Sequence, residues 1–262
     1  MDRIMNERPS ITAFFPACND AGTIGSVVVG VIGALEELTD DYEVIVVENG
    51  STDYTVEVLE ALAEHYPQLR VYTHREPLGY GGALRVGFAS ASKDLIFYTD
   101  GDAQYDPREI KLLLPALRDD IDIVNGWKID RGDPMHRIVI GRVYHHLVKF
   151  LFGFKLRDVD CDFRLIRRDV FDVIDLESDS GTICLELVKK LQDAGFAFAE
   201  VPVHHFHRTY GKSQFFNFPR LWRTGVQLIG LWWKLVVRRE HMRRIANRRS
   251  QLARSSVDSP HR

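Results

Sequence analysis

Short apolar runs alternate with helical patterns along the first half of the chain. The apolar runs lie at residues 11–16, 42–48, 69–74, 94–99 and 121–126. The second run, YEVIVVE, is unbroken and rich in β-branched residues, which is typical of a strand buried on both faces. Helical periodicity occurs at residues 23–38, 56–65 and 83–91, and Pro107 stands where a further helix would begin. Strands that alternate with helices through short connections predict an α/β fold, with a mostly parallel, Rossmann-like sheet and helices on both faces.

The second half of the chain has a less regular pattern. Residues 127–135 are polar and predict a mobile loop. Helical periodicity returns at 136–152 and at 182–194, and a strand is expected at 197–203. The residues at 215–249 predict one or two further helices.

These patterns divide the chain into four parts. A flexible N-terminus at 1–10 precedes a single α/β domain at 11–213. Amphipathic helices are expected at 214–249. The last residues, 250–262, are polar and predict a disordered tail.

Three polar segments, each with a glycine, follow three of the predicted strands. They are PACNDAG (16–22), ENGSTD (48–53) and DGDAQYDP (100–107). Turns favour the same residue types, so each segment alone is a weak signal. Ligands of open parallel sheets bind beyond the carboxyl ends of the strands, however. Three such segments at equivalent strand ends therefore predict a binding site at that edge of the sheet.

The most informative residues in these segments are Asp100 and Asp102. They are separated by one residue at a strand end, so their carboxylates are expected to face a common point. Mg²⁺ and Mn²⁺ prefer oxygen ligands and often share phosphate oxygens with a substrate, and Gln104 adds a neutral oxygen. The alternative is a turn in which an aspartate caps the helix at Pro107, but Asp106 is better placed for that task.

Length, composition and net charge exclude several classes of protein. With 262 residues, 45% of them hydrophobic, the chain can form one large domain with its own core. The net charge of −3 gives no sign of a nucleic-acid partner. Three cysteines make no disulfide framework and fit a reducing compartment, and the polar residues 1–10 have no apolar segment typical of a secretory signal. A GxGxxG turn after the first strand and a P-loop lysine motif are both missing, which argues against the common nucleotide-binding folds.

The C-terminal region combines aromatic residues with arginines. Its most apolar stretch, 224–237, is shorter than the about 20 residues that a transmembrane helix needs. Six Phe and Trp residues lie between 215 and 233, and seven arginines follow between 238 and 254. This pattern predicts a helix at the surface of an anionic membrane. The alternative is a helix that packs on the domain or on a second copy of the chain in a homodimer.

The chain resembles the family 2 glycosyltransferases, and within them the dolichol-phosphate mannosyltransferase-like branch. The matching segments are PACND (16–20), VVENGSTD (46–53), LGYGGALRVG (78–87), DGDAQYDP (100–107), DCDFRLIRR (160–168), EVPVHHFHR (200–208) and YGKS (210–213). The resemblance implies a GT-A fold. It also implies inverting transfer of a sugar from a nucleotide-diphosphate sugar, GDP-mannose or a UDP-sugar, to a polyprenyl or dolichyl phosphate.

The same resemblance implies a set of site residues. Asp100, Asp102 and Gln104 would hold Mg²⁺ or Mn²⁺. The donor-binding residues would be Pro16, Asn19, Asp20, Glu48, Gly50, Asp53, Gly79, Asp100, Arg208, Lys212 and Ser213. Glu48 stands where the branch usually has aspartate, and it can still accept hydrogen bonds from the ribose or the base. Arg208 and Lys212 are candidates for binding phosphates, because a diphosphate leaving group needs cations rather than a proton donor.

The chemical nature of the acceptor determines which residues, in addition to Asp102, take part in catalysis. A phosphate acceptor is already anionic, so it needs cations, and the branch places them where Lys128, Arg142 and Arg164 stand. A hydroxyl acceptor on a lipid or glycan would need a base instead, for which Asp158, Asp160 and Asp162 are candidates.

A third possibility is a protein that binds nucleotide sugars without transferring them, which the intact DGDAQ and RTYGKS segments disfavour. The leading hypothesis is a polyprenyl-phosphate glycosyltransferase. It would be peripheral at the inner, cytoplasmic face of the membrane.

Overall fold

The computed structural model describes residues 8–129, 135–210 and 218–257. Its seven-stranded sheet has the order β3-β2-β1-β4-β6-β5-β7. The strands are β1 (Ile11–Ala17), β2 (Tyr42–Asn49), β3 (Leu69–His74), β4 (Leu95–Thr99), β5 (Ile123–Ile129), β6 (Phe163–Arg167) and β7 (Phe198–His204). Strand β6 runs antiparallel to both of its neighbours, and the other strand pairs are parallel. The mostly parallel sheet predicted from the sequence is therefore confirmed.

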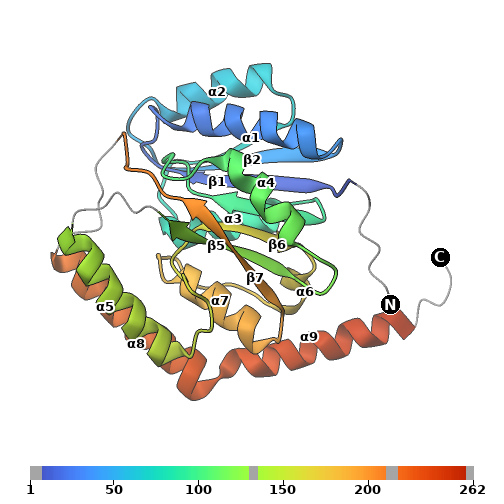
Figure 1. Cartoon of the computed structure of the whole chain (residues 1–262), viewed down its shortest axis with the longest axis vertical. Coiled ribbons are helices and arrows are strands. Elements are labelled where there is room, and N and C mark those ends of the chain that lie inside the picture. Colours follow the sequence, from blue (N-terminus) through green and yellow to red (C-terminus); the bar gives the residue numbers. More distant parts are fainter. Residues whose placement is uncertain (1–7, 130–134, 211–217, 258–262) are drawn as a thin grey trace.

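Helices cover both faces of the sheet, as expected (Figure 1). One face carries α1 (Ile24–Leu38), α2 (Thr55–His65) and α4 (Ile110–Leu113). The other face carries α3 (Gly79–Ser90), α6 (Val170–Val173) and α7 (Ile183–Asp193). All seven residues of β1 are buried, because this strand has a helix layer on each side.

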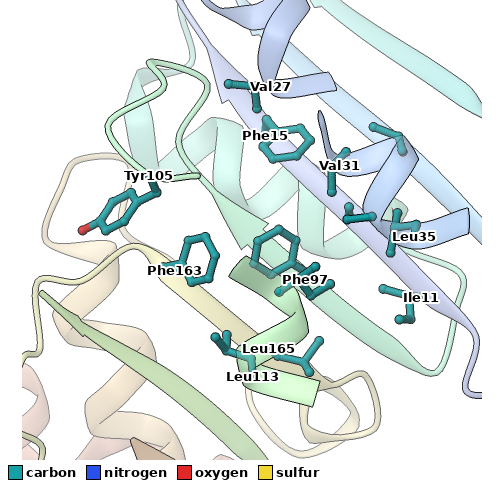
Figure 2. Close-up of a cluster of buried hydrophobic side chains, with 14 of the residues drawn as sticks. Ile11, Phe15, Val27, Val31, Leu35, Phe97, Tyr105, Leu113, Phe163 and Leu165 are labelled. Carbon is teal, nitrogen blue, oxygen red and sulfur yellow. The ribbon is translucent and has the colours of Figure 1, made fainter. Parts of the chain in front are cut away.

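Aromatic rings fill the core below the carboxyl ends of β1 and β4 and the first residue of β6 (Figure 2). Phe97 of β4 and Phe163 of β6 meet edge to face, with ring centroids 4.9 Å apart. Tyr105 packs on Phe163 at 5.5 Å and is itself buried. Aromatic rings at such separations attract one another. Because Tyr105 belongs to the DGDAQYDP segment, this packing fixes the segment on the core.

The remaining helices form a layer beside α7. They are α5 (Met135–Phe152), α8 (Phe218–Trp232), a π-helical segment (Trp233–Arg238) and α9 (Glu240–Val257). Helices α5 and α8 lie side by side in Figure 1, and the indole N–H of Trp232 donates to the carbonyl of Leu151 at 2.9 Å. Their inner residues pack on α7 in a separate cluster that includes Phe152, Leu231 and Leu185. Within the described ranges, no helix has the length and apolarity of a membrane span.

Three expectations differ from the structure. Residues 127–129, expected in a loop, continue β5 and pair with residues 202–204 of β7. Strand β6 was not predicted, because FRLIR is short and holds two arginines. Residues 250–257, expected in the disordered tail, extend α9, which is anchored by the buried Ile245 near its start. Residues 1–7, 130–134, 211–217 and 258–262 lie outside the described part of the chain.

Candidate active site

The turns after β1 and β2 are joined by a set of hydrogen bonds. Asn19 has a left-handed backbone (φ 58°), and its N–H donates to the Ser51 hydroxyl at 3.0 Å. Its side-chain oxygen accepts from the N–H of Thr52 at 2.8 Å. One turn further, Asp53 accepts from the N–H of Ala21 at 3.2 Å. The two segments predicted to bind the donor therefore form one surface at the carboxyl edge of the sheet.

Glu48 lies at the end of β2 and is only 1% exposed. Its Oε1 accepts from the N–H of Ser51 at 2.5 Å, which closes the turn around Gly50. Gly50 has a φ of 73°, and a Cβ there would lie 2.7 Å from the ring of Pro77. An L side chain at this position would therefore be strained, and the turn depends on glycine.

The glycine-rich segment 78–82 packs tightly against residues 178 and 179. A Cβ on Gly79 would lie 2.3 Å from the carbonyl oxygen of Asp179. Between the glycines, Tyr80 donates its hydroxyl to Asp100 at 2.8 Å. Tyr80 was not predicted as a site residue, although it lies inside the LGYGG segment. It orients the first aspartate of the predicted metal site.

Four carboxylates gather at this edge, and the pKa values of two of them are shifted upward. Burial, followed by repulsion from Asp162 and Asp102, holds the pKa of Asp100 well above its usual range. Burial also raises the pKa of Asp20 to about 6, with a further contribution from Asp102. Such a concentration of negative charge favours the binding of a cation.

Arg208 supplies a cation to this cluster from the loop after β7. Its guanidinium contacts the carboxylate of Asp102, which is 4% exposed. Gln104 donates its side-chain N–H to the carbonyl of Phe206 at 3.3 Å, so the DGDAQ turn and this loop are linked. Asp106 accepts from the N–H of Arg108 at 3.0 Å, which confirms it as the residue that caps the following helical turn.

On the other side of β4, Lys128 lies among aspartates. Its Nζ donates to the backbone carbonyl of Asp160 at 2.7 Å and lies 3.9 Å from the Asp158 carboxylate. Burial alone would lower the pKa of Lys128, but the nearby carboxylates, Asp158 first, outweigh it and raise that pKa. Lys128 therefore stays protonated at neutral pH. Burial raises the pKa of Asp160 to about 6.

Arg164, predicted to contact the acceptor, is fully buried inside the sheet. Its Nε donates to Asn125 and its Nη2 to the carbonyl of Val159, both at 2.6 Å. Its Nη1 lies 3.4 Å from Asp162, which also accepts from the hydroxyl of Tyr98. The structure thus places Arg164 beneath the site, where it supports Asp162. The side chain of Arg142, and Lys212 and Ser213 entirely, lie outside the described residues.

Residues 12–175 match the family model described as Glycosyl transferase family 2. The chain belongs to this family. It is 32% identical to the glycosyltransferase AglD of Haloferax volcanii in an alignment of 244 residues that covers 90% of this chain and 39% of AglD. It is 27% identical over 213 residues to an undecaprenyl-phosphate 4-deoxy-4-formamido-L-arabinose transferase of an Enterobacter species, over 80% of this chain and 64% of that protein. The chain thus spans less than two thirds of both relatives.

Solved structures with the same fold include glucosyl-3-phosphoglycerate synthase from Mycobacterium tuberculosis. Its complex with Mn²⁺, UDP and glucosyl-3-phosphoglycerate gives a TM-score of 0.65 at 22% identity, over 86% of this chain and 79% of that one. Its complex with Mn²⁺, UDP and phosphoglyceric acid gives 0.67. The likeness confirms the GT-A fold of this family 2 glycosyltransferase, and at this identity it shows the fold alone.

For a family 2 glycosyltransferase, a first prediction concerns the donor. We expect Glu48→Ala and Asp20→Ala to weaken UDP or GDP binding by about tenfold or more, since each removes an acceptor worth about 1.5–3 kcal/mol when charged. Titration calorimetry measures this directly. Glu43→Ala is a matched control, because Glu43 is buried at the opposite end of β2 and accepts from the N–H of Ser92. Unchanged affinity in both test variants would place the nucleotide elsewhere.

Proposed function

We propose that this protein is an inverting transferase that moves a sugar from a nucleotide-diphosphate sugar to a polyprenyl phosphate. The observation that carries the proposal is the placement of α5. One side of this helix exposes Val143, Leu147 and Phe150, and the opposite side brings His145 to Asp158 and Asp160. A single helix thus carries an exposed apolar surface on one side and contacts the proposed acceptor side with the other, an arrangement that would suit a lipid-linked acceptor. The acceptor in the name of the Enterobacter relative supports the same class.

On the donor side, Asp100, Asp102 and Gln104 would hold Mg²⁺ or Mn²⁺. The fit rests on charge, because Asp100 is crowded by Asp102 and Asp162 and its pKa is raised. The bound ion would neutralise the charge that develops on the diphosphate leaving group. The Mn²⁺ and UDP of the solved synthase complexes support this assignment.

The protein's own residues have separate tasks toward the donor. The interlocked turns would hold the nucleoside through Pro16, Asn19, Asp20, Glu48, Gly50, Asp53 and Gly79. Arg208, already beside Asp102, would contact the donor phosphates together with Lys212 and Ser213. The donor would be GDP-mannose or a UDP-sugar.

On the acceptor side, Lys128 and Arg142 would hold the lipid phosphate near the anomeric carbon. A phosphate oxygen forms the new bond to that carbon while the bond to the donor diphosphate breaks, so no proton has to move. Arg164 would act indirectly, by positioning Asp162 through their 3.4 Å contact.

A donor screen tests the function. The protein is incubated with UDP- and GDP-sugars, Mn²⁺ or Mg²⁺, and membrane lipid extract that contains polyprenyl phosphate. The proposal expects an acid-labile glycolipid, because a sugar joined to phosphate at its anomeric carbon hydrolyses readily in acid. An acid-stable glycolipid would instead indicate a hydroxyl acceptor. Absence of any glycolipid with every donor would contradict the proposal.

We further propose that the protein binds a membrane from its cytoplasmic side through what we call the α5–α8 face. This face consists of the exposed residues Val143, Leu147, Phe150, Trp222, Val226, Ile229 and Trp233. Their spacing puts one apolar stripe on each helix, and the helices lie side by side (Figure 1). Phe150 is 84% and Trp222 73% exposed, which is unusual for large apolar side chains gathered on one surface. The inner face of α8 packs on the domain, so only the outer face remains for a membrane.

A second prediction tests this face. The double variant Phe150→Asp/Trp222→Asp should bind phosphatidylglycerol vesicles at least about tenfold more weakly, because burying one such ring contributes about 1.5–3 kcal/mol. Added salt should weaken binding of the natural chain only in part, since it screens the arginines but not the apolar contact. Leu112→Asp, on an exposed leucine of α4, is the control in vesicle cosedimentation. Equal binding of the double variant and the control would contradict the assignment.

A further inference from the structure

We propose that His145, Asp158 and Asp160 form a second site for a divalent transition-metal ion, separate from the Asp100/Asp102 turn. Each residue offers one ligand atom, and these three atoms all lie within 4.8 Å of one another. His145 comes from α5, and the two aspartates come from the segment that leads from α5 to β6. This site could not be predicted from the sequence, because the helical spacing of α5 does not show which side faces the aspartates.

The surroundings of Asp160 favour a bound cation. Within the described part of the chain its carboxylate accepts no hydrogen bond, while its backbone carbonyl accepts from Lys128. The Lys128 Nζ is 3.9 Å from the Asp158 carboxylate, which is too long for a hydrogen bond. Lys128 therefore compensates part of the negative charge, and its backbone N–H also donates to the Asp158 carboxylate at 3.3 Å, which orients that aspartate. Asp160 is partly buried, and a carboxylate that is partly shielded from water and beside a second carboxylate is stabilised by a bound cation.

The ligand set indicates which ion would bind. One imidazole nitrogen with two carboxylate oxygens suits Zn²⁺ or Mn²⁺ better than Mg²⁺ or Ca²⁺, which prefer oxygen ligands alone. The donor turn offers only oxygens from Asp100, Asp102 and Gln104, so the two sites would differ in preference. Three protein ligands also leave a coordination position for water or an anion. If the proposed function holds, that position adjoins the acceptor phosphate at Lys128, but metal binding itself does not depend on that function.

Zn²⁺ binding to the full chain, with neither donor nor acceptor present, tests the site. Titration of Zn²⁺ against a fluorescent chelator should reveal one tight equivalent in the natural protein. We expect His145→Ala and Asp160→Asn each to weaken it by at least about tenfold, since even changes beside a metal ligand have such effects. His145→Gln serves as a second variant that keeps a polar side chain, and circular dichroism checks the fold of each.

Two control variants distinguish this site from Zn²⁺ binding at surface histidines or at the donor turn. His146→Ala removes the exposed neighbouring imidazole on α5 and should leave the tight equivalent intact. Asp102→Ala should also leave it intact, because the donor turn is separate. Equal loss in His146→Ala and His145→Ala would indicate ordinary surface binding and overturn the proposal. Loss in Asp102→Ala alone, or no tight equivalent at all, would overturn it as well. Because no sugar transfer is measured, failure of the proposed function would not affect these results.

Discussion

Replacing Asp102 with alanine is expected to lower the transfer rate by about two to three orders of magnitude while the protein stays folded. Asp102 is buried at the carboxyl edge of the sheet, beside Asp100 and in contact with Arg208. Its loss would remove a ligand of the donor metal just where charge develops on the diphosphate. Losing one such electrostatic contact typically costs about 3–4 kcal/mol in the transition state, which gives this factor. Initial rates at saturating donor measure it.

Asp106→Ala is the matched control in the same turn. This aspartate caps the following helical turn through the N–H of Arg108. Its replacement should therefore reduce the free energy of unfolding by about 1 kcal/mol and leave the rate nearly unchanged. EDTA should abolish transfer by the natural protein, and added Mn²⁺ should restore it. Full activity in EDTA, or in the Asp102→Ala variant, would rule out the metal assignment.

Replacing Lys128 or Arg142 with alanine is expected to slow transfer to polyprenyl phosphate by about ten- to a hundredfold. Removing a cation that contacts a phosphate costs about 1.5–3 kcal/mol. Donor binding should remain, because Lys128 lies beside Asp158 and Asp160, apart from the nucleotide turns. Rates with farnesyl phosphate, together with calorimetry of the donor, separate the two effects. Lys155→Ala, an exposed lysine beyond α5, is the control.

The variant Asp162→Asn distinguishes a phosphate from a hydroxyl acceptor. Asp162 is held by Tyr98, Arg164 and Cys184, and it faces Asp100. With a phosphate acceptor the loss of its charge should be mild, because no base is needed. With a hydroxyl acceptor it would be one of the candidate bases, and loss of the base would cost about a hundredfold or more. Severe loss in Asp162→Asn together with nearly normal Lys128→Ala would replace the proposed acceptor with a hydroxyl.

The meeting of the three polar donor-side segments at one edge of the sheet was predictable from the sequence. Strands β1, β2 and β4 are unbroken apolar runs, and the polar segments after them can only meet at one edge of a parallel sheet. The arrangement of the acceptor side was not predictable from the sequence, because it depends on β6. That strand is short and antiparallel, and its pairing turns Arg164 into the interior, whereas the family resemblance implied a cation facing the substrate.

The helical periodicity of α5 was likewise insufficient to predict which residues face the site. It predicted that a helix would form, but not that one side would face aspartates and another would be exposed. Which neighbour a helix side meets is decided by tertiary packing, here by the contact of α5 with α8 and α7.

The pairing of α5 with α8 also determines the concentration unit in which the reaction rate should be expressed. If an acceptor reaches the site along a helix that lies on the membrane, it is encountered by lateral diffusion in two dimensions. The relevant concentration is then molecules per area of bilayer, and the volume of the surrounding solution drops out. With the protein fully bound and the soluble donor saturating, inert lipid would slow turnover at a fixed total amount of acceptor, while a change in buffer volume would not.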